Sequence, residues 1–307
     1  MNTKFKILLA TDYSEAVMNA ERYAVQFAKA TESLLCFMHV YNPALPARNK
    51  SYQNIIMEKA GMENLKLQKH CHRLLQTLEI NPDELLTEII VREGNNAGKL
   101  IRKEAKEKGI DFIIVGTHGV SDFSDLFFGT HTWDVIKKST VPVIVVPGDA
   151  MFTGFKNIVF GTEYREGEMP VLNYLVQFAK HFESEITVLH ATNYALSKEL
   201  EKVMYEKFKS DLHVKILYQN IKMKLIKSEN IVQGLNKFCK NNEIDLLVVS
   251  PEKPFLLEKI FSPLNSIVRK MSFYTTVPLM SIPDFYNPEY LEFWQHFAQG
   301  EYVNEDF

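Results

Sequence analysis

The chain has 307 residues, 46% of them hydrophobic and 24% charged, with a formal net charge of -3 at pH 7. This composition predicts a globular protein of two domains, and the small acidic excess argues against a dedicated nucleic-acid-binding protein. The apolar runs fall short of the ~20 residues of a membrane helix, and the one after Met1 is too short for a signal peptide, so we expect a cytoplasmic protein with no membrane partner.

Short apolar runs alternate with amphipathic stretches along the first half of the chain. The predicted strands are 5–10, 34–40, 86–91, 111–115 and 141–146, and the predicted helices are 17–28, 51–79, 96–108 and a short one from 130. Continuous apolar strands separated by helices predict a parallel sheet covered on both faces, which is a doubly wound α/β fold.

The second half repeats the first. Residues 174–180 repeat residues 23–29 almost unchanged, and 244–249 match 110–115. The repeat predicts strands at 156–161, 185–191, 221–226, 244–249 and 277–282, and helices at 169–182, 198–210, 229–242 and 266–273. The sequence therefore predicts two tandem domains, 1–149 and 150–283, followed by an acidic and aromatic tail, 284–307.

The carboxyl ends of the strands are the expected binding edge of such a sheet. In the first half these ends are Ala10, Thr11 and Asp12, then Val40, and then Gly116. The carboxylate of Asp12 could accept hydrogen bonds from sugar hydroxyls.

A glycine-rich segment follows the fourth strand. It reads Gly116, Thr117, His118 and Gly119, then nine residues, then Gly129, Thr130 and His131. Such glycines let backbone N–H groups approach an anion, and the helix that starts near Thr130 favours phosphate at its N-terminus. His118 and His131 lie beside this loop as possible ligand contacts. The alternative interpretation is that the glycines only form turns.

The spacing Gly116-x2-Gly119-x9-Gly129-Thr130, with the apolar strands at 7–12 and 141–147, resembles the universal stress protein family over residues 4–147 and, more weakly, over 156–283. The resemblance implies a five-stranded parallel sheet in the order 3-2-1-4-5 that binds ATP or another adenine nucleotide. Asp12 and the backbone around Val40 would then hold ribose and adenine, while Gly119, Gly129 and Thr130 would hold the phosphates.

The loop from 119 to 129 differs from many family members because it has no Lys or Arg and contains Asp122 and Asp125. Two carboxylates near a triphosphate repel it unless Mg²⁺ intervenes, so ADP and AMP stay open beside ATP. The resemblance also implies pairing through last strands. We expect 141–146 to pair with 277–282 as an intramolecular pseudo-dimer, which could still form a homodimer through other surfaces.

The second copy has lost most of the glycine pattern. Glu163 replaces Asp12, Ser250 replaces Gly116, and Lys253 stands at the place of Gly119. Asn265 and Ser266 replace the last glycine and threonine, so we expect this copy to support the first and to bind no phosphate.

The histidines and cysteines predict neither a metal site nor a catalytic centre. The run His-Cys-His at 70–72 puts its side chains on different faces of a helix, which predicts a solvated helix. His39 and His190, at equivalent strand ends, are expected to pack or to form hydrogen bonds, and Cys36 is expected in the core.

Three functions remain open. The first is a stress-response protein that binds a nucleotide and does not turn it over, since no nucleophile–base set is present. The second is a slow ATP hydrolase, with Asp12 holding Mg²⁺ and His118 or His131 aiding a water molecule. The third is a scaffold that recruits an unknown protein partner through the tail.

Overall fold

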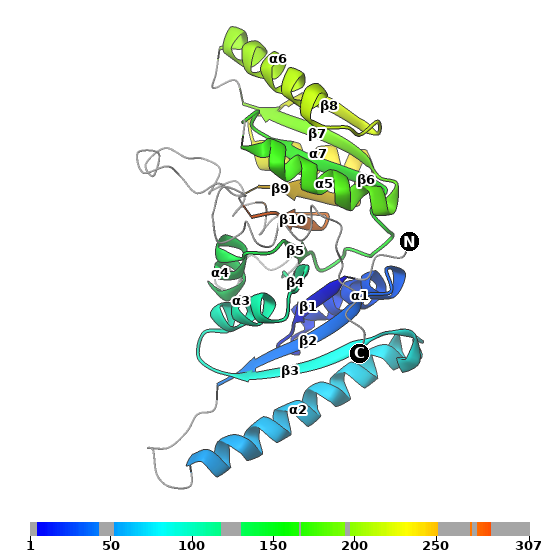
Figure 1. Ribbon diagram of the computed structural model, residues 1–307, viewed down its shortest axis with the longest axis vertical. Helices are drawn as coiled ribbons and strands as arrows, with labels where there is room; N and C mark the ends of the chain where they lie inside the picture. The colour runs from blue at the N-terminus through cyan, green and yellow to red at the C-terminus, as the bar shows by residue number, and fades with distance from the viewer. Residues whose placement is uncertain are drawn as a thin grey trace. The chain divides into compact units, whose positions relative to one another are not determined.

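The computed structural model describes residues 5–42, 52–117, 130–165, 167–193, 197–250, 271 and 275–283. The chain divides into two compact units, Met1–Phe152 and Thr153–Phe307 (Figure 1). The predicted domain limits at 149 and 283 stay predictions, and the predicted tail, 284–307, lies outside the described residues. Each unit is described below by itself.

Unit 1 is a doubly wound α/β domain. Its elements are β1 (Lys6–Ala10), α1 (Glu15–Ala30), β2 (Leu34–Tyr41), α2 (Tyr52–Thr77), a 3-10 turn (Pro82–Glu84), β3 (Thr87–Glu93), α3 (Ala97–Glu107), β4 (Phe112–Gly116), α4 (Thr130–Lys138) and β5 (Val143–Val146). The strands lie in the order β3-β2-β1-β4-β5, and the paired strands are parallel. The predicted fold class and strand order are confirmed.

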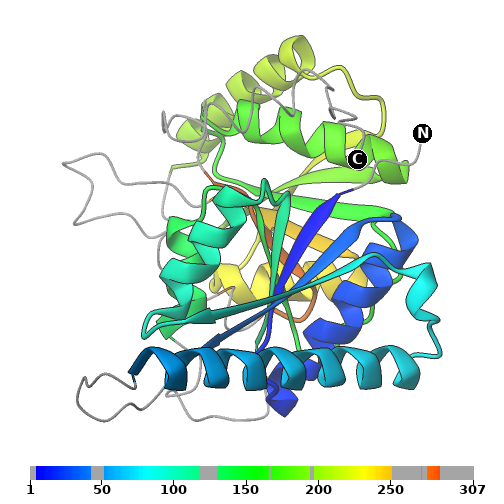
Figure 2. The same ribbon diagram turned by 60° about the horizontal axis from the view of Figure 1, so that its bottom comes forward.

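Helices cover both faces of this sheet. α1 contacts α2, and α3 contacts α4 (Figures 1 and 2). The chain runs from β1 through β2 to β3 at one edge of the sheet and then returns to β4 and β5 on the other side of β1. Because parallel crossovers are right-handed, these two directions put α1 and α2 on one face of the sheet and α3 and α4 on the other. The core between the layers is apolar, with Leu8, Phe27 and Ile113 fully buried.

Unit 2 repeats the architecture. Its elements are β6 (Asn157–Thr162), α5 (Glu168–Phe182), β7 (Glu185–Thr192), α6 (Lys198–Lys215), β8 (Ile221–Lys227), α7 (Ile231–Asn241), β9 (Leu246–Val249) and β10 (Leu279–Ser281). The strands lie in the order β10-β9-β6-β7-β8, which is the order of unit 1. The predicted helix at 266–273 falls outside the described residues except for Met271.

All predicted strands are confirmed to within two residues at their ends. The prediction was wrong at the end of α6, which extends to Lys215 where a helix over 198–210 was expected. The extension follows from Leu212 and Ile216, four residues apart and both buried, which draw this last turn onto the unit.

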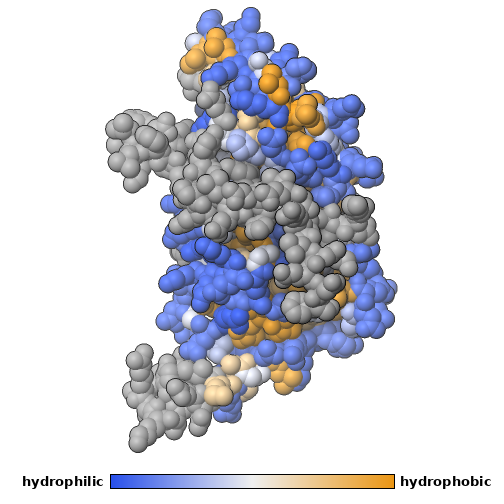
Figure 3. All heavy atoms as spheres, in the orientation of Figure 1, coloured by the Kyte–Doolittle hydropathy of each residue, from blue (hydrophilic) through white to orange (hydrophobic). Residues whose placement is uncertain are grey.

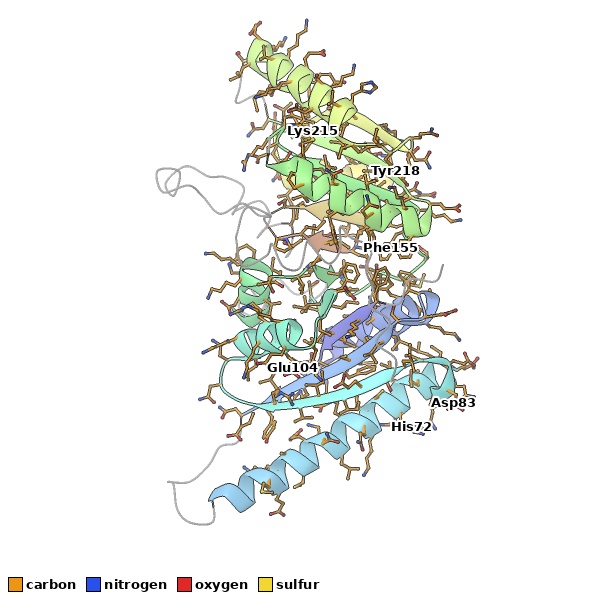
Figure 4. All side chains as sticks on the ribbon, in the orientation of Figure 1. His72, Asp83, Glu104, Phe155, Lys215 and Tyr218 are labelled. Carbon is orange, nitrogen blue, oxygen red and sulfur yellow. The ribbon has the colours of Figure 1, made fainter. Side chains whose placement is uncertain are left out.

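The repeated aspartates at 111 and 245 make the same contact in both units. Asp111 accepts a hydrogen bond from the backbone N–H of Lys6 at 2.8 Å, and Asp245 accepts one from that of Asn157 at 2.7 Å. Each carboxylate thereby ties the start of the fourth strand to the start of the first. In unit 2 the Ser184 hydroxyl donates to the carbonyl of Phe155, and Tyr218 donates to that of Ser184 at 2.5 Å (Figure 4).

One close helix–strand approach differs between the units. A Cβ added at Gly94 in unit 1 would lie 2.7 Å from Cδ1 of Leu100, so a side chain at residue 94 would require the Leu100 side chain to shift. In unit 2 the small residue is on the helix, and a Cβ added at Gly234 would lie 2.6 Å from Cβ of Ser228. In unit 1 the glycine follows the strand and the larger side chain is on the helix, whereas in unit 2 the glycine is on the helix and the serine follows the strand.

Hydrophilic residues cover most of the described surface on the face shown in Figure 3. β8, at the end of the strand order of unit 2, presents the exposed lysines Lys222, Lys224 and Lys227. Lys222 pairs with Glu185, and the ammonium of Lys224 lies 5.3 Å from the ring centre of Phe238. No helix in the described part of the chain has both the length and the apolar character to cross a membrane.

Candidate functional site

The candidate site of unit 1 lies where β1, β2 and β4 end. β1 pairs with β2 on one side and with β4 on the other, so that Ala10 is level with Met38 and Leu9 with Ile114. The chain leaves β1 and β4 toward opposite faces of the sheet, which makes this edge its topological switch point.

A tight turn, Thr11–Ser14, follows β1. The backbone N–H of Tyr13 donates to the hydroxyl oxygen of Thr11 at 3.1 Å, and that of Ser14 donates to Oδ1 of Asp12 at 2.9 Å. Tyr13 has a left-handed backbone, with φ of 66°. The Asp12 side chain is exposed while Thr11 is buried, so the turn presents the carboxylate at the edge of the sheet.

The structure brings together the predicted residues at the three strand ends. Ala10, Val40 and Gly116 are half-buried at this edge, and Thr117 is buried, with its N–H donating to the carbonyl of Val146 at 3.0 Å. The remaining predicted residues are in the glycine-rich loop. His118, Gly119 and Gly129 lie outside the described residues, and Thr130 and His131 form the first turn of α4, where only the backbone is described.

His39 on β2 supports this turn. Its Nδ1 lies 2.8 Å from the carbonyl oxygen of Thr11, and because a carbonyl only accepts, the Nδ1–H donates. Its ring packs on that of Tyr13 with centroids 4.4 Å apart. The predicted packing and hydrogen-bonding role of His39 is confirmed, and His190 makes the same 2.8 Å contact to the carbonyl of Thr162.

The sequence interpretation missed a group of polar side chains on α2. Glu63, Lys66 and His70, which we call the α2 polar face, are spaced to share one side of the helix. The ammonium of Lys66 lies 4.3 Å from the ring centre of Tyr13, and Oε2 of Glu63 lies 3.9 Å from Nε2 of His39. Burial, the carboxylate of Glu63 and that of Glu21 on α1 raise the pKa of the Tyr13 hydroxyl.

His70 makes the tightest of these contacts. Its Nε2 lies 2.9 Å from both carboxylate oxygens of Glu21 on α1, and Oε1 of Glu21 also accepts the Thr11 hydroxyl at 2.5 Å. The prediction that 70–72 is a solvated helix was therefore wrong for His70 and for the buried Cys71, because this side of α2 faces α1. It is confirmed for His72, which is exposed (Figure 4).

Unit 2 keeps the turn but closes it differently. The Thr162 hydroxyl donates to Glu168 at 2.5 Å, and this carboxylate also accepts the N–H groups of Glu163 at 3.1 Å and Arg165 at 3.3 Å. Burial outweighs these hydrogen bonds and raises the pKa of Glu168 to about 7. Glu163, at the position of Asp12, pairs with the guanidinium of Arg165. In unit 2 the carboxylate of Glu163 therefore already has a positively charged partner, Arg165, within the same turn.

Within the described ranges, no group of three or more His, Cys, Asp or Glu side chains is arranged to hold a metal ion. Cys36 is buried as predicted, and burial together with Glu88 raises the pKa of its thiol to about 12. The described residues thus offer the exposed carboxylate of Asp12 at the edge where β1, β2 and β4 end. Buried polar contacts of the neighbouring Thr11 hold this turn in place.

The sequence of unit 1 is similar to that of known proteins. Residues 5–147 match the model of the universal stress protein family. A universal stress protein of Bacillus subtilis is 26% identical over 145 residues, which cover 46% of this chain and 97% of that protein. A second, from Methanocaldococcus jannaschii, is 26% identical over 157 residues, covering 46% of this chain and 93% of that protein.

The likeness in fold extends over both units. The crystal structure of a universal stress protein from Archaeoglobus fulgidus has a TM-score of 0.64 and 16% identity to this chain, covering 90% of it and 97% of the other protein. At that identity the match supports the fold alone. Together with the strand order common to both units, these findings show that residues 5–147 form a universal stress protein domain and that the second unit repeats its fold in tandem.

Proposed function

We propose that unit 1 binds an adenine nucleotide, with ATP as the first choice, at the ends of β1, β2 and β4, and that the protein acts in a stress response. The observation that carries this proposal is the Thr11–Ser14 turn, which presents the exposed carboxylate of Asp12 at the switch point beside Gly116. A carboxylate in this position is suited to accept hydrogen bonds from the hydroxyls of a ribose.

The phosphates have a second set of candidate partners. α4 begins at Thr130, directly after the last glycine of the motif, and the N-terminus of a helix favours an anion. The glycine pattern of the sequence supports phosphate binding by backbone N–H groups of residues 116–119 and 129–130. Mg²⁺ would offset the charges of Asp122 and Asp125, and without it ADP or AMP would be the better ligand.

Unit 2 is proposed as a supporting unit that binds no nucleotide. Its turn carries Glu163 already paired with Arg165, so part of the acceptor capacity of this carboxylate is used before a ribose hydroxyl could bind. The pairing of 141–146 with 277–282, a homodimer through other surfaces, a protein partner and a cytoplasmic location all remain proposals.

The test is direct. Small molecules released from the purified chain are identified by mass spectrometry, and the ligand-free chain is then titrated with ATP, ADP and AMP, with and without Mg²⁺. We expect one adenine nucleotide per chain and no binding to a chain that carries Gly119→Val and Gly129→Val, because a side chain at either glycine blocks the approach of the backbone. Absence of binding at millimolar nucleotide, or full affinity in the double variant, would refute the proposal.

A further inference from the structure

The turn that carries Asp12 is held in place by a carboxylate on a different element. Glu21 on α1 is 1% exposed, and a carboxylate at such a site is costly unless its oxygens have partners. The two partners are the hydroxyl of Thr11, at 2.5 Å from Oε1, and Nε2 of His70, at 2.9 Å from both oxygens. Glu21 therefore links the turn to α2.

Thr11 is the central residue of this link. Its N–H donates to the carbonyl of Met38 at 2.9 Å and its own carbonyl accepts from His39, so its backbone is fixed to β2. Its hydroxyl donates to Glu21 and accepts the N–H of Tyr13, which leaves that hydroxyl one orientation. Since Asp12 is the next residue, the position of its carboxylate follows from these contacts.

His70 extends the link to α2, because both oxygens of Glu21 lie at the same 2.9 Å from its Nε2. The ring of His70 also meets that of Tyr13 edge-on, with centroids 5.1 Å apart. The helix therefore contacts the turn through a carboxylate and through an aromatic side chain.

Unit 2 lacks this link. The carboxylate that accepts the Thr162 hydroxyl belongs to Glu168, the first residue of α5, and it also accepts two backbone N–H groups of its own turn. From α6 the turn receives the rings of Tyr205 and Phe208, packed on Tyr164. The hydrogen bonds to the buried carboxylate of unit 2 thus stay within its own turn and the start of α5, whereas in unit 1 the buried carboxylate also contacts α2 through His70.

We propose that Glu21 and His70 are positioning residues that act through Thr11 to set the Asp12 carboxylate for a sugar hydroxyl, so that the docking of α2 controls how well unit 1 recognises the ribose. This inference rests on the proposed nucleotide site. It goes beyond that site because it assigns sugar discrimination to the buried Glu21 and the half-buried His70, which lie outside the glycine motif, and to a helix that the motif does not include.

The experiment compares ATP with 2′,3′-dideoxy-ATP, which lacks both sugar hydroxyls, by calorimetric titration of the full chain. We expect the chain to bind ATP about tenfold more tightly than the dideoxy analogue. Thr11→Val should weaken ATP binding about tenfold and bring the ratio of the two dissociation constants close to one, whereas Thr11→Ser should keep the ratio because it keeps the hydroxyl. His70→Leu should reduce the ratio to an intermediate value.

The repeat supplies a matched control. Thr162→Val removes the equivalent hydroxyl in unit 2, and we expect it to leave both dissociation constants unchanged while lowering the stability of its own unit, measured by thermal melting. If the chain binds no nucleotide, the proposed function fails and the inference fails with it.

The inference alone is refuted if the chain binds ATP but does not discriminate against the dideoxy analogue, or if Thr11→Val keeps the discrimination. It is equally refuted if Thr11→Val and Thr162→Val weaken binding alike. Should Thr11→Val not fold, an unchanged ratio in His70→Leu would overturn the link to α2.

Discussion

Raising the pH from about 5 to about 8 should weaken unit 2 through one buried carboxyl, that of Glu168. Burial raises its pKa to about 7, against the ordinary value of 4.5. Because the folded chain holds this proton more tightly than the unfolded chain, the group stabilises the fold fully below pH 4.5 and loses that contribution as the pH rises through 7. The whole contribution is about 3 kcal/mol, of which about 2.5 kcal/mol is lost between pH 5 and pH 8.

The assay is hydrogen–deuterium exchange of the full chain, followed on peptides from β6 and β7 and corrected for the intrinsic pH dependence of exchange. Glu168→Gln is the matched variant, since its amide keeps the size of the side chain and does not titrate. We expect the opening free energy of unit 2 to fall with pH in the unchanged protein and to vary much less in the variant. Parallel pH profiles of the two proteins, or a rise with pH in the unchanged one, would refute the reasoning.

The other predictions concern the loop, the core and the thiols. Gly119→Val and Gly129→Val should each abolish nucleotide binding with little change in melting temperature, while Asp12→Ala should only weaken it; titration calorimetry and thermal melting distinguish these outcomes. Gly234→Leu should destabilise unit 2 by about 2 kcal/mol, and adding Ser228→Gly should recover at least half, because unit 1 pairs a glycine with a leucine there; urea denaturation of the single and double variants measures the recovery. Burial raises the pKa of all three cysteine thiols to about 11 or 12, so a disulfide reagent at pH 8 should label none of them before unfolding; fast labelling of the native chain would contradict this.

Local patterns predicted the fold well because the inner strands of each sheet, such as β4, β6 and β9, are buried on both faces. The run at 111–115 needs no partner to be recognised as a strand, and its repeat at 244–249 predicted the second unit. The structure also explains why the aspartate recurs in both copies, since Asp111 and Asp245 each accept a hydrogen bond from the backbone N–H of the first residue of the neighbouring strand.

The site was predictable only in its exposed part. Asp12 can be recognised as a candidate from the sequence because it directly follows an apolar strand. The contact between Glu21 and His70, in contrast, joins residues 49 positions apart on two helices. A helix pattern shows which residues share a face but not what that face meets. The one available signal was the spacing of Glu63, Lys66 and His70, which sets polar side chains on the same side of α2 as the buried Leu67.

The lysines of β8 have a consequence for how this protein behaves when it is concentrated. A second copy that added its own β8 to this strand would bring the lysines of the two strands close together, Lys222 and Lys224 on one face and Lys227 on the other, since paired strands lie ~5 Å apart. Like charges at that distance repel, so Lys222, Lys224 and Lys227 protect an edge whose other side chains, among them Met223 and Leu225, are largely apolar. Acylation of these three lysines would remove the charges that oppose such pairing.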